Sequence, residues 1–69
     1  MIRARIKGHS EWRNCGTDDP TDAAIHCASY ADSDDVTVEV IRQHAAEIKV
    51  YEVQRRTAYK VTELPSVPA

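Results

Sequence analysis

Hydrophobic and polar residues alternate at the start of the chain. Even positions are apolar and odd positions basic, in the order Ile2, Arg3, Ala4, Arg5, Ile6 and Lys7. Successive side chains of a strand point to opposite faces, so this alternation predicts a strand with one buried and one basic face. Gly8 allows the backbone to turn after this strand. Residues 11–15 are then the candidate for a short antiparallel partner of the strand.

A helix start is the strongest local signal in the chain. Asp19 is a suitable N-cap, Pro20 suits the first helical position, and Asp22 places a carboxylate near the positive end of the helix dipole. The predicted helix runs from Pro20 to about Ala31. Its apolar stripe consists of small residues, with Ile25 beside it: Ala24, Cys27, Ala28 and Ala31. The acidic run 32–35 ends the helix without a glycine or asparagine cap, so we expect that end to fray.

A strand is predicted over 36–41, where β-branched residues dominate and Val36, Val38 and Val40 alternate with polar positions. Residues 42–47 are ambiguous, because they are good helix formers where a hairpin would favour glycine or asparagine. A helix over 41–52 is the alternative. We reject it because residues 48–53 return to β-branched and aromatic types and leave no continuous apolar helical face.

The stretch 48–64 changes phase, because Ile48 and Val50 share one parity while Tyr51, Val53 and Tyr59 share the other. A β-bulge accounts for this shift with one extra residue. A turn at 54–57 would instead divide the stretch into two strands. Residues 65–69 are predicted to be a disordered tail, which leaves residues 1–64 as a single domain without repeats or linkers.

These elements predict an α+β fold in which one short helix packs on an antiparallel sheet of three or four strands, in the order β-(β)-α-β-β. The predicted core combines the apolar helical stripe with one sheet face: Ile6, Ala24, Ala28, Val38, Val40, Val50, Val53 and Tyr59. An exposed edge strand and a small core would both gain from pairing, so a homodimer is a further expectation.

Composition limits the chain to one small domain. It has 69 residues and a net charge of -2, and its large aliphatic residues number 13, which is just under the share typical of folded chains. The low net charge favours folding nonetheless. No apolar run approaches the length of a membrane helix, and the alternating start does not resemble a signal peptide. We therefore expect a cytoplasmic protein that does not enter a membrane.

Catalytic and metal-binding patterns are weak. Cys27 follows His26, but adjacent helical residues point about 100° apart and do not form a dyad. The two cysteines and the histidines lack the closely paired spacing of zinc ligands, and the acidic clusters lack the frame of a calcium loop. A disulfide between Cys15 and Cys27 would need an oxidising compartment, to which nothing in the sequence points. We expect no enzyme activity, no metal and no cofactor.

Basic residues remain as the candidate binding feature. Several would form a positive sheet surface suited to phosphates or acidic protein if they shared one face, although such charges are also typical of a solvated face. Trp12 stands in a polar stretch, where it is either core or an interface anchor. The candidate partner-binding residues are Arg3, Arg5, Lys7, Trp12, Arg13, Arg55 and Arg56.

The order of elements resembles that of small phage accessory proteins. This order begins with a basic first strand and the segment Glu11-Trp12-Arg13, followed by the helix whose start is indicated by Asp19-Pro20-Thr21-Asp22. The strand Val36-Thr37-Val38-Glu39-Val40 and a long final strand complete it. It is similar to the β-α-β-β type found among anti-CRISPR proteins and phage inhibitors of host RNA polymerase. The resemblance implies a non-catalytic inhibitor that covers a surface of a host protein or ribonucleoprotein complex. It implies no particular site residues. The alternative is a nucleic-acid-binding regulator that uses a basic sheet face.

Overall fold

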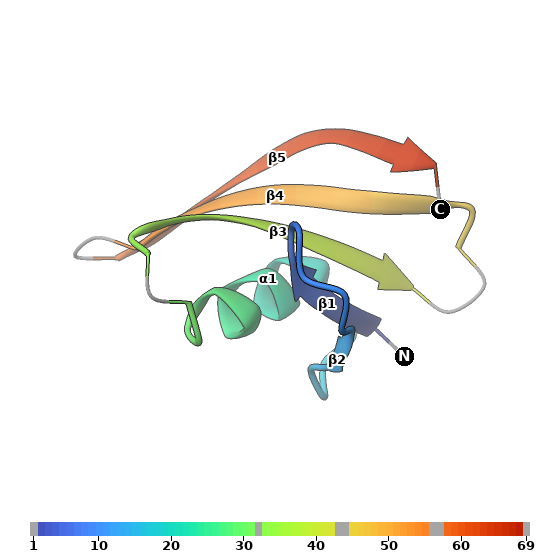
Figure 1. Cartoon of the computed structure of the whole chain (residues 1–69), viewed down its shortest axis with the longest axis horizontal. Coiled ribbons are helices and arrows are strands. Elements are labelled where there is room, and N and C mark those ends of the chain that lie inside the picture. The colour runs from blue at the N-terminus through green and yellow to red at the C-terminus, as the bar shows by residue number, and fades with distance from the viewer. Residues whose placement is uncertain (1, 32, 43–44, 56–57, 69) are drawn as a thin grey trace.

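One antiparallel sheet with a helix on one face forms the structure, a computed structural model that describes residues 2–31, 33–42, 45–55 and 58–68. Its elements are β1 (Ile2–Ile6), β2 (Arg13–Asn14), α1 (Pro20–Ala28), β3 (Asp35–Arg42), β4 (Glu47–Arg55) and β5 (Tyr59–Pro68). The strands lie in the order β2-β1-β3-β4-β5, with α1 against one face (Figure 1). The α+β class with a single short helix is confirmed, and the sheet has five strands rather than three or four.

Helix α1 begins as the sequence predicts. The Asp19 carboxylate accepts a hydrogen bond of 2.9 Å from the backbone N–H of Thr21, and Pro20 occupies the first turn. The helix ends at Ala28, three residues before the predicted boundary, and two further turn hydrogen bonds carry the chain on to Ala31. At nine residues, α1 is too short to cross a membrane, and no other helix occurs in the described ranges.

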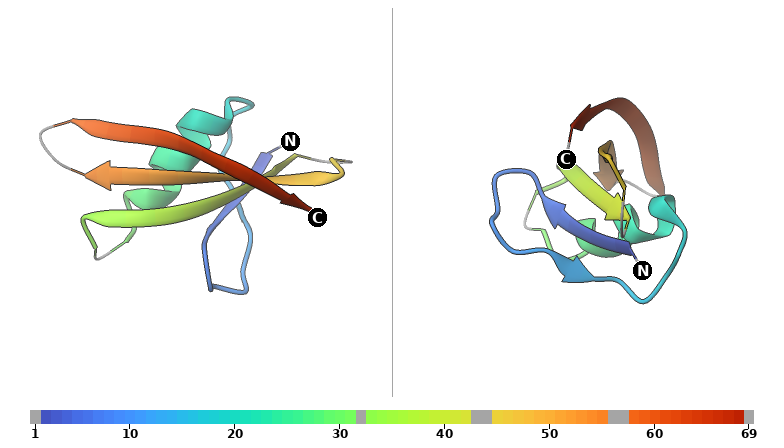
Figure 2. Two further views of the ribbon diagram at one scale, coloured as in Figure 1. Left: turned by 90° about the horizontal axis from the view of Figure 1, so that it is seen from above. Right: turned by 90° about the vertical axis from the view of Figure 1, so that its right-hand side faces the viewer.

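Strand β1 lies inside the sheet, although it is first in the sequence. It pairs antiparallel with β2 on one side and with β3 on the other, and α1 connects β2 to β3. Strands β3, β4 and β5 follow one another as a meander. The two views of Figure 2 show the twist of this sheet and the position of β5 at its far edge.

The segment 47–68 follows the second alternative, a division into two strands, and the β-bulge that it also contains lies at residues 65–66, outside the stretch 48–64 whose phase changes. It is split into β4 and β5, and the register also shifts, because Val50 pairs with Leu64 while Ile48 pairs with Val67. The extra β5 residue between these pairs is a β-bulge. Strand β4 also excludes a helix over 41–52. Residues 43–44 and 56–57 of the two predicted turns lie outside the described residues.

The prediction of a disordered tail at 65–69 is wrong for residues 65–68. They belong to β5, where Val67 pairs with Ile48 and Pro68 pairs with Glu47. Proline is tolerated here because an edge strand needs ladder hydrogen bonds on one side only. Ala69 lies outside the described residues.

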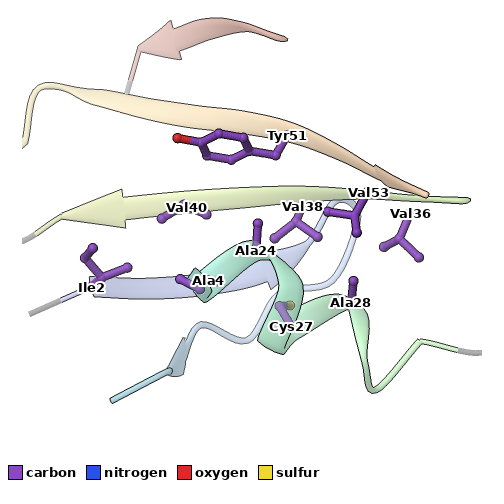
Figure 3. Close-up of a cluster of buried hydrophobic side chains, with 11 residues drawn as sticks. Ile2, Ala4, Ala24, Cys27, Ala28, Val36, Val38, Val40, Tyr51 and Val53 are labelled. Atoms are coloured by element: carbon purple, nitrogen blue, oxygen red, sulfur yellow. The ribbon is translucent and has the colours of Figure 1, made fainter. Parts of the chain in front are cut away.

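The core lies between α1 and the sheet and is built from small residues. Four alanines in it are fully buried: Ala4, Ala23, Ala24 and Ala28. They bring the helix backbone close to the branched side chains of β3 and β4 (Figure 3). The prediction is confirmed for five core residues: Ala24, Ala28, Val38, Val40 and Val53. Ile6 is half-buried against the same cluster.

Two predicted core residues lie outside the cluster beneath α1, although one of them, Val50, is buried as predicted. Val50 is buried outside the cluster beneath α1, because its β3 partner is Glu39, whose neighbours Val38 and Val40 face the helix. Tyr59 is 45% exposed, so the prediction that it is core is wrong. It pairs with Arg55 at the hairpin end of β4 and β5, and this hairpin extends beyond α1 (Figure 1).

Candidate functional site: a surface around the β1 and β2 hairpin

Arg5 is held in place on the sheet face opposite α1. The register pairs it with Glu39 of β3, and its Nε donates a hydrogen bond of 3.0 Å to Glu39 Oε1. Its guanidinium carbon lies 4.2 Å from the centroid of the Trp12 ring, which is a cation-π contact. Since Glu39 is only 8% exposed, this ion pair is partly shielded from water and fixes both Arg5 and Trp12.

Arg13 forms a second pair with an aromatic ring, on the helix side of the sheet. It is the β2 partner of Ala4, which is fully buried beneath α1. Its guanidinium carbon lies 5.4 Å from the centroid of the Tyr30 ring. Tyr30 follows α1, is 61% exposed, and also meets His26 edge to face at a centroid distance of 5.3 Å. An exposed tyrosine is thus held between a cation and an imidazole.

Two shallow depressions lie beside these pairs and share Ile6, His9 and Tyr30. The larger has a volume of about 490 Å³ and is also lined by Lys7. The smaller, of about 130 Å³, is also lined by Arg5 and Arg13. We call the polar and aromatic side chains that line these depressions, together with Trp12, which contacts Arg5, the hairpin surface: Arg5, Lys7, His9, Trp12, Arg13 and Tyr30.

Four of the seven predicted site residues therefore come together: Arg5, Lys7, Trp12 and Arg13. Arg3 is exposed on β1, where it pairs with Ile41 and lies two residues before Arg5 on the same face. Arg55 is not part of the site, because its Nη1 donates to the backbone carbonyls of Ala31 and Ser33. It holds the segment between α1 and β3. Arg56 lies outside the described residues.

Sequence reasoning missed Tyr30 and His9. Tyr30 ends the predicted helix, and its exposure and contact with Arg13 depend on how β2 passes the helix, which no local pattern reveals. His9 belongs to the turn after β1, where its N–H donates to the carbonyl of Ile6. The hairpin surface is thus rich in arginine and aromatic residues, the types that dominate protein interfaces.

The described residues offer little for metal binding or thiol catalysis. Within the described ranges, no three His, Cys, Asp or Glu side chains are grouped closely enough to hold a metal ion. Cys15 and Cys27 are free thiols, and burial is the main cause that raises the pKa of each above its ordinary value. Both are therefore mainly protonated at neutral pH, and only the small thiolate fraction of each is nucleophilic.

Comparisons with protein-family models, with curated protein sequences and with solved structures found no match to this chain.

Proposed function

We propose that this protein is a non-catalytic binding protein of phage or mobile-element origin, which inhibits a host protein complex by covering one of its surfaces. The hairpin surface is the contact region. The observation that carries the proposal is the pair of arginine-aromatic contacts, Arg5 with Trp12 and Arg13 with Tyr30, because both arginines and Tyr30 line the same depression. The order of elements, which resembles that of phage inhibitors, supports the same function.

The chemistry of the surface defines the partner. Arginine and lysine favour carboxylates, and the exposed Tyr30 ring offers apolar contact with one polar group at its tip. Arg5 and Trp12 are already fixed by Glu39, so little side-chain entropy is lost when they bind. An acidic protein surface with an apolar ridge complements these features.

Affinity capture from host lysate tests the proposal with matched variants. Tyr30→Ala and Arg13→Ala are expected to lose the captured protein complex, because interface tyrosine and arginine residues contribute most of the binding energy. Tyr59→Ala is the control for Tyr30, since both tyrosines are exposed and Tyr59, on the β4 and β5 hairpin, lines neither depression. Lys49→Ala, an exposed cation on β4, is the control for Arg13. Equal capture by all four variants would overturn the proposal.

Nuclease treatment separates this function from nucleic-acid binding. A protein complex that survives nuclease supports inhibition by surface covering. Material that disappears with nuclease, together with an affinity that falls steeply as salt increases, would instead identify a nucleic-acid-binding regulator.

A further inference from the structure

Cys15 lies on the helix side of the sheet, directly after β2. Its neighbour two residues earlier, Arg13, pairs with the buried Ala4 of β1. Since alternate residues of a strand share a face, Cys15 is also directed toward α1. Its Sγ lies 3.9 Å from the backbone carbonyl oxygen of Ala23, and the side chain packs against the buried core. Cys15 is half-buried, which leaves part of it accessible from solution.

Cys27 occupies the facing position on α1. It follows Ala23 by four residues, so the two share one face of the helix. Helical side chains lean toward the N-terminus, which directs the Cys27 thiol toward the turn that Cys15 contacts. Figure 3 shows Cys27 among the core residues beneath the sheet. After burial, the charge of an ionised Cys15 is the next cause that raises the pKa of Cys27.

We propose that Cys15 and Cys27 are a site of reversible thiol-disulfide exchange, which takes a low-molecular-weight disulfide such as oxidised glutathione and forms an intramolecular disulfide. The half-buried Cys15 reacts first. Its thiolate attacks one sulfur of oxidised glutathione, forms a mixed disulfide and releases one glutathione thiolate. The Cys27 thiolate then attacks the Cys15 sulfur, closes the Cys15–Cys27 bond and releases the second glutathione. The two protein thiols lose two electrons and two protons, and oxidised glutathione is reduced to two thiols.

The bond would close the segment 15–27 into a loop and tie β2 to α1. Arg13 lies two residues before one cysteine, and Tyr30 lies three residues after the other. Oxidation would therefore fix the spacing of the Arg13 and Tyr30 pair from both sides. The inference stands on the positions of the two thiols alone, so it holds whether or not the hairpin surface binds a partner.

The experiment uses the reduced full chain, equilibrated with mixtures of reduced and oxidised glutathione and then quenched with an alkylating reagent. We expect the intact mass of the monomer to fall by two hydrogens as the oxidised share rises, and a digest to yield Cys15 and Cys27 in one linked peptide. The thermal midpoint of the oxidised form should rise by several degrees, because cross-linking restricts the unfolded chain. Two retained thiols, or two bound glutathiones without the linked peptide, would overturn the proposal.

Single-cysteine variants complete the test. Cys15→Ser should retain one alkylatable thiol in every mixture, because the buried Cys27 has no partner and is poorly accessible. Cys27→Ala should stop at the mixed disulfide on Cys15. If Cys27→Ala fails to fold, as judged by circular dichroism, Cys15→Ser still decides the matter. A mixed disulfide with glutathione on Cys27 of that variant, formed as readily as the linked peptide forms in the unmodified chain, would contradict the role of Cys15 as the thiol that reacts first.

Discussion

The guanidinium of Arg5 stacks over the ring of Trp12 at 4.2 Å and at the same time donates a hydrogen bond to Glu39. Three strands or their extensions contribute to this contact, since Arg5 belongs to β1, Glu39 to β3, and Trp12 directly precedes β2. The positive charge of Arg5 on this basic strand is thus paired within the protein, with Glu39. Arg5 also lines a surface depression and holds the only tryptophan of the chain in place.

Removal of Glu39 should destabilise the protein and release Trp12. Glu39→Ala leaves Arg5 without its ion-pair partner in a partly shielded position, so we expect a loss of about 1–3 kcal/mol in the free energy of unfolding. Urea denaturation followed by Trp12 fluorescence measures both effects. The half-buried Glu52 of β4 provides the control, Glu52→Ala, which should change stability by less than about 0.5 kcal/mol. Equal losses in the two variants would contradict this role for Glu39.

The close approach of α1 to the sheet should make the alanine positions intolerant of larger residues. Ala24 is fully buried between the helix and the strands. Ala24→Leu overfills this space, and we expect a loss of about 1–3 kcal/mol, measured by chemical denaturation. Ala46→Leu adds the same volume at an exposed position and should leave the stability nearly unchanged.

Deletion of residues 65–69 tests whether the end of β5 contributes to the sheet. The deletion removes the partners of Ile48 and Glu47 in the β4 ladder. We expect a loss of about 1 kcal/mol or more in stability, from lost hydrogen bonds and from exposure of Ile48. Amide hydrogen exchange at residues 47–49 should accelerate in the shortened chain. An unchanged stability would mean that this segment does not pair with β4.

When both cysteines are kept reduced, the free energy of unfolding should fall at alkaline pH. Burial raises the pKa of Cys15 and Cys27 above 9.0 and that of Tyr51 above 10.0. Above pH 9 the unfolded chain therefore loses protons that the folded chain retains, so the free energy of unfolding declines as pH rises. The stability contributed by these groups is fully present below their ordinary pKa values. Denaturation curves from pH 7 to 11 measure the decline.

A cysteine-free chain is the control for the alkaline experiment. The double variant Cys15→Ser and Cys27→Ala should show a smaller decline between pH 9 and 10, because Tyr51 is then the one group left among the described residues whose pKa burial raises. The Tyr51 hydroxyl donates a hydrogen bond of 3.3 Å to Glu63 Oε1, and this carboxylate further disfavours ionisation of the tyrosine. A decline that persists unchanged in the double variant would exclude the thiols as its cause.

Local signals in the sequence were sufficient to predict the elements that contain them. The Asp19 cap and Pro20 define where α1 starts, and the alternating valines define β3 and its buried face. The end of α1 was placed too late, because no single residue there stops a helix. Pro65 and Pro68 suggested a disordered tail, but edge position and a β-bulge accommodate both prolines in β5. Edge position depends on the whole sheet and is not a local property.

The candidate site, like the fold, was predicted correctly only where local signals determine it. The alternation of β1 correctly grouped Arg3 with Arg5 on one face. Arg13 and Arg55 were candidates for the same surface only if they shared that face, and they do not: Arg13 meets Tyr30 on the helix side and Arg55 binds the carbonyls that follow α1. Their orientation depends on a two-residue strand and on the length of a helix. The spacing of charges along the chain predicts neither of these features.

The inner position of β1 affects the order in which the chain assembles during synthesis. Residues 2–6 are made well before their β3 partners, residues 38–42, which follow more than thirty positions later. The meander of β3, β4 and β5, by contrast, joins neighbouring segments, and contacts between neighbours form faster than distant ones. We therefore expect the pairing of β1 with β3 to form after the meander.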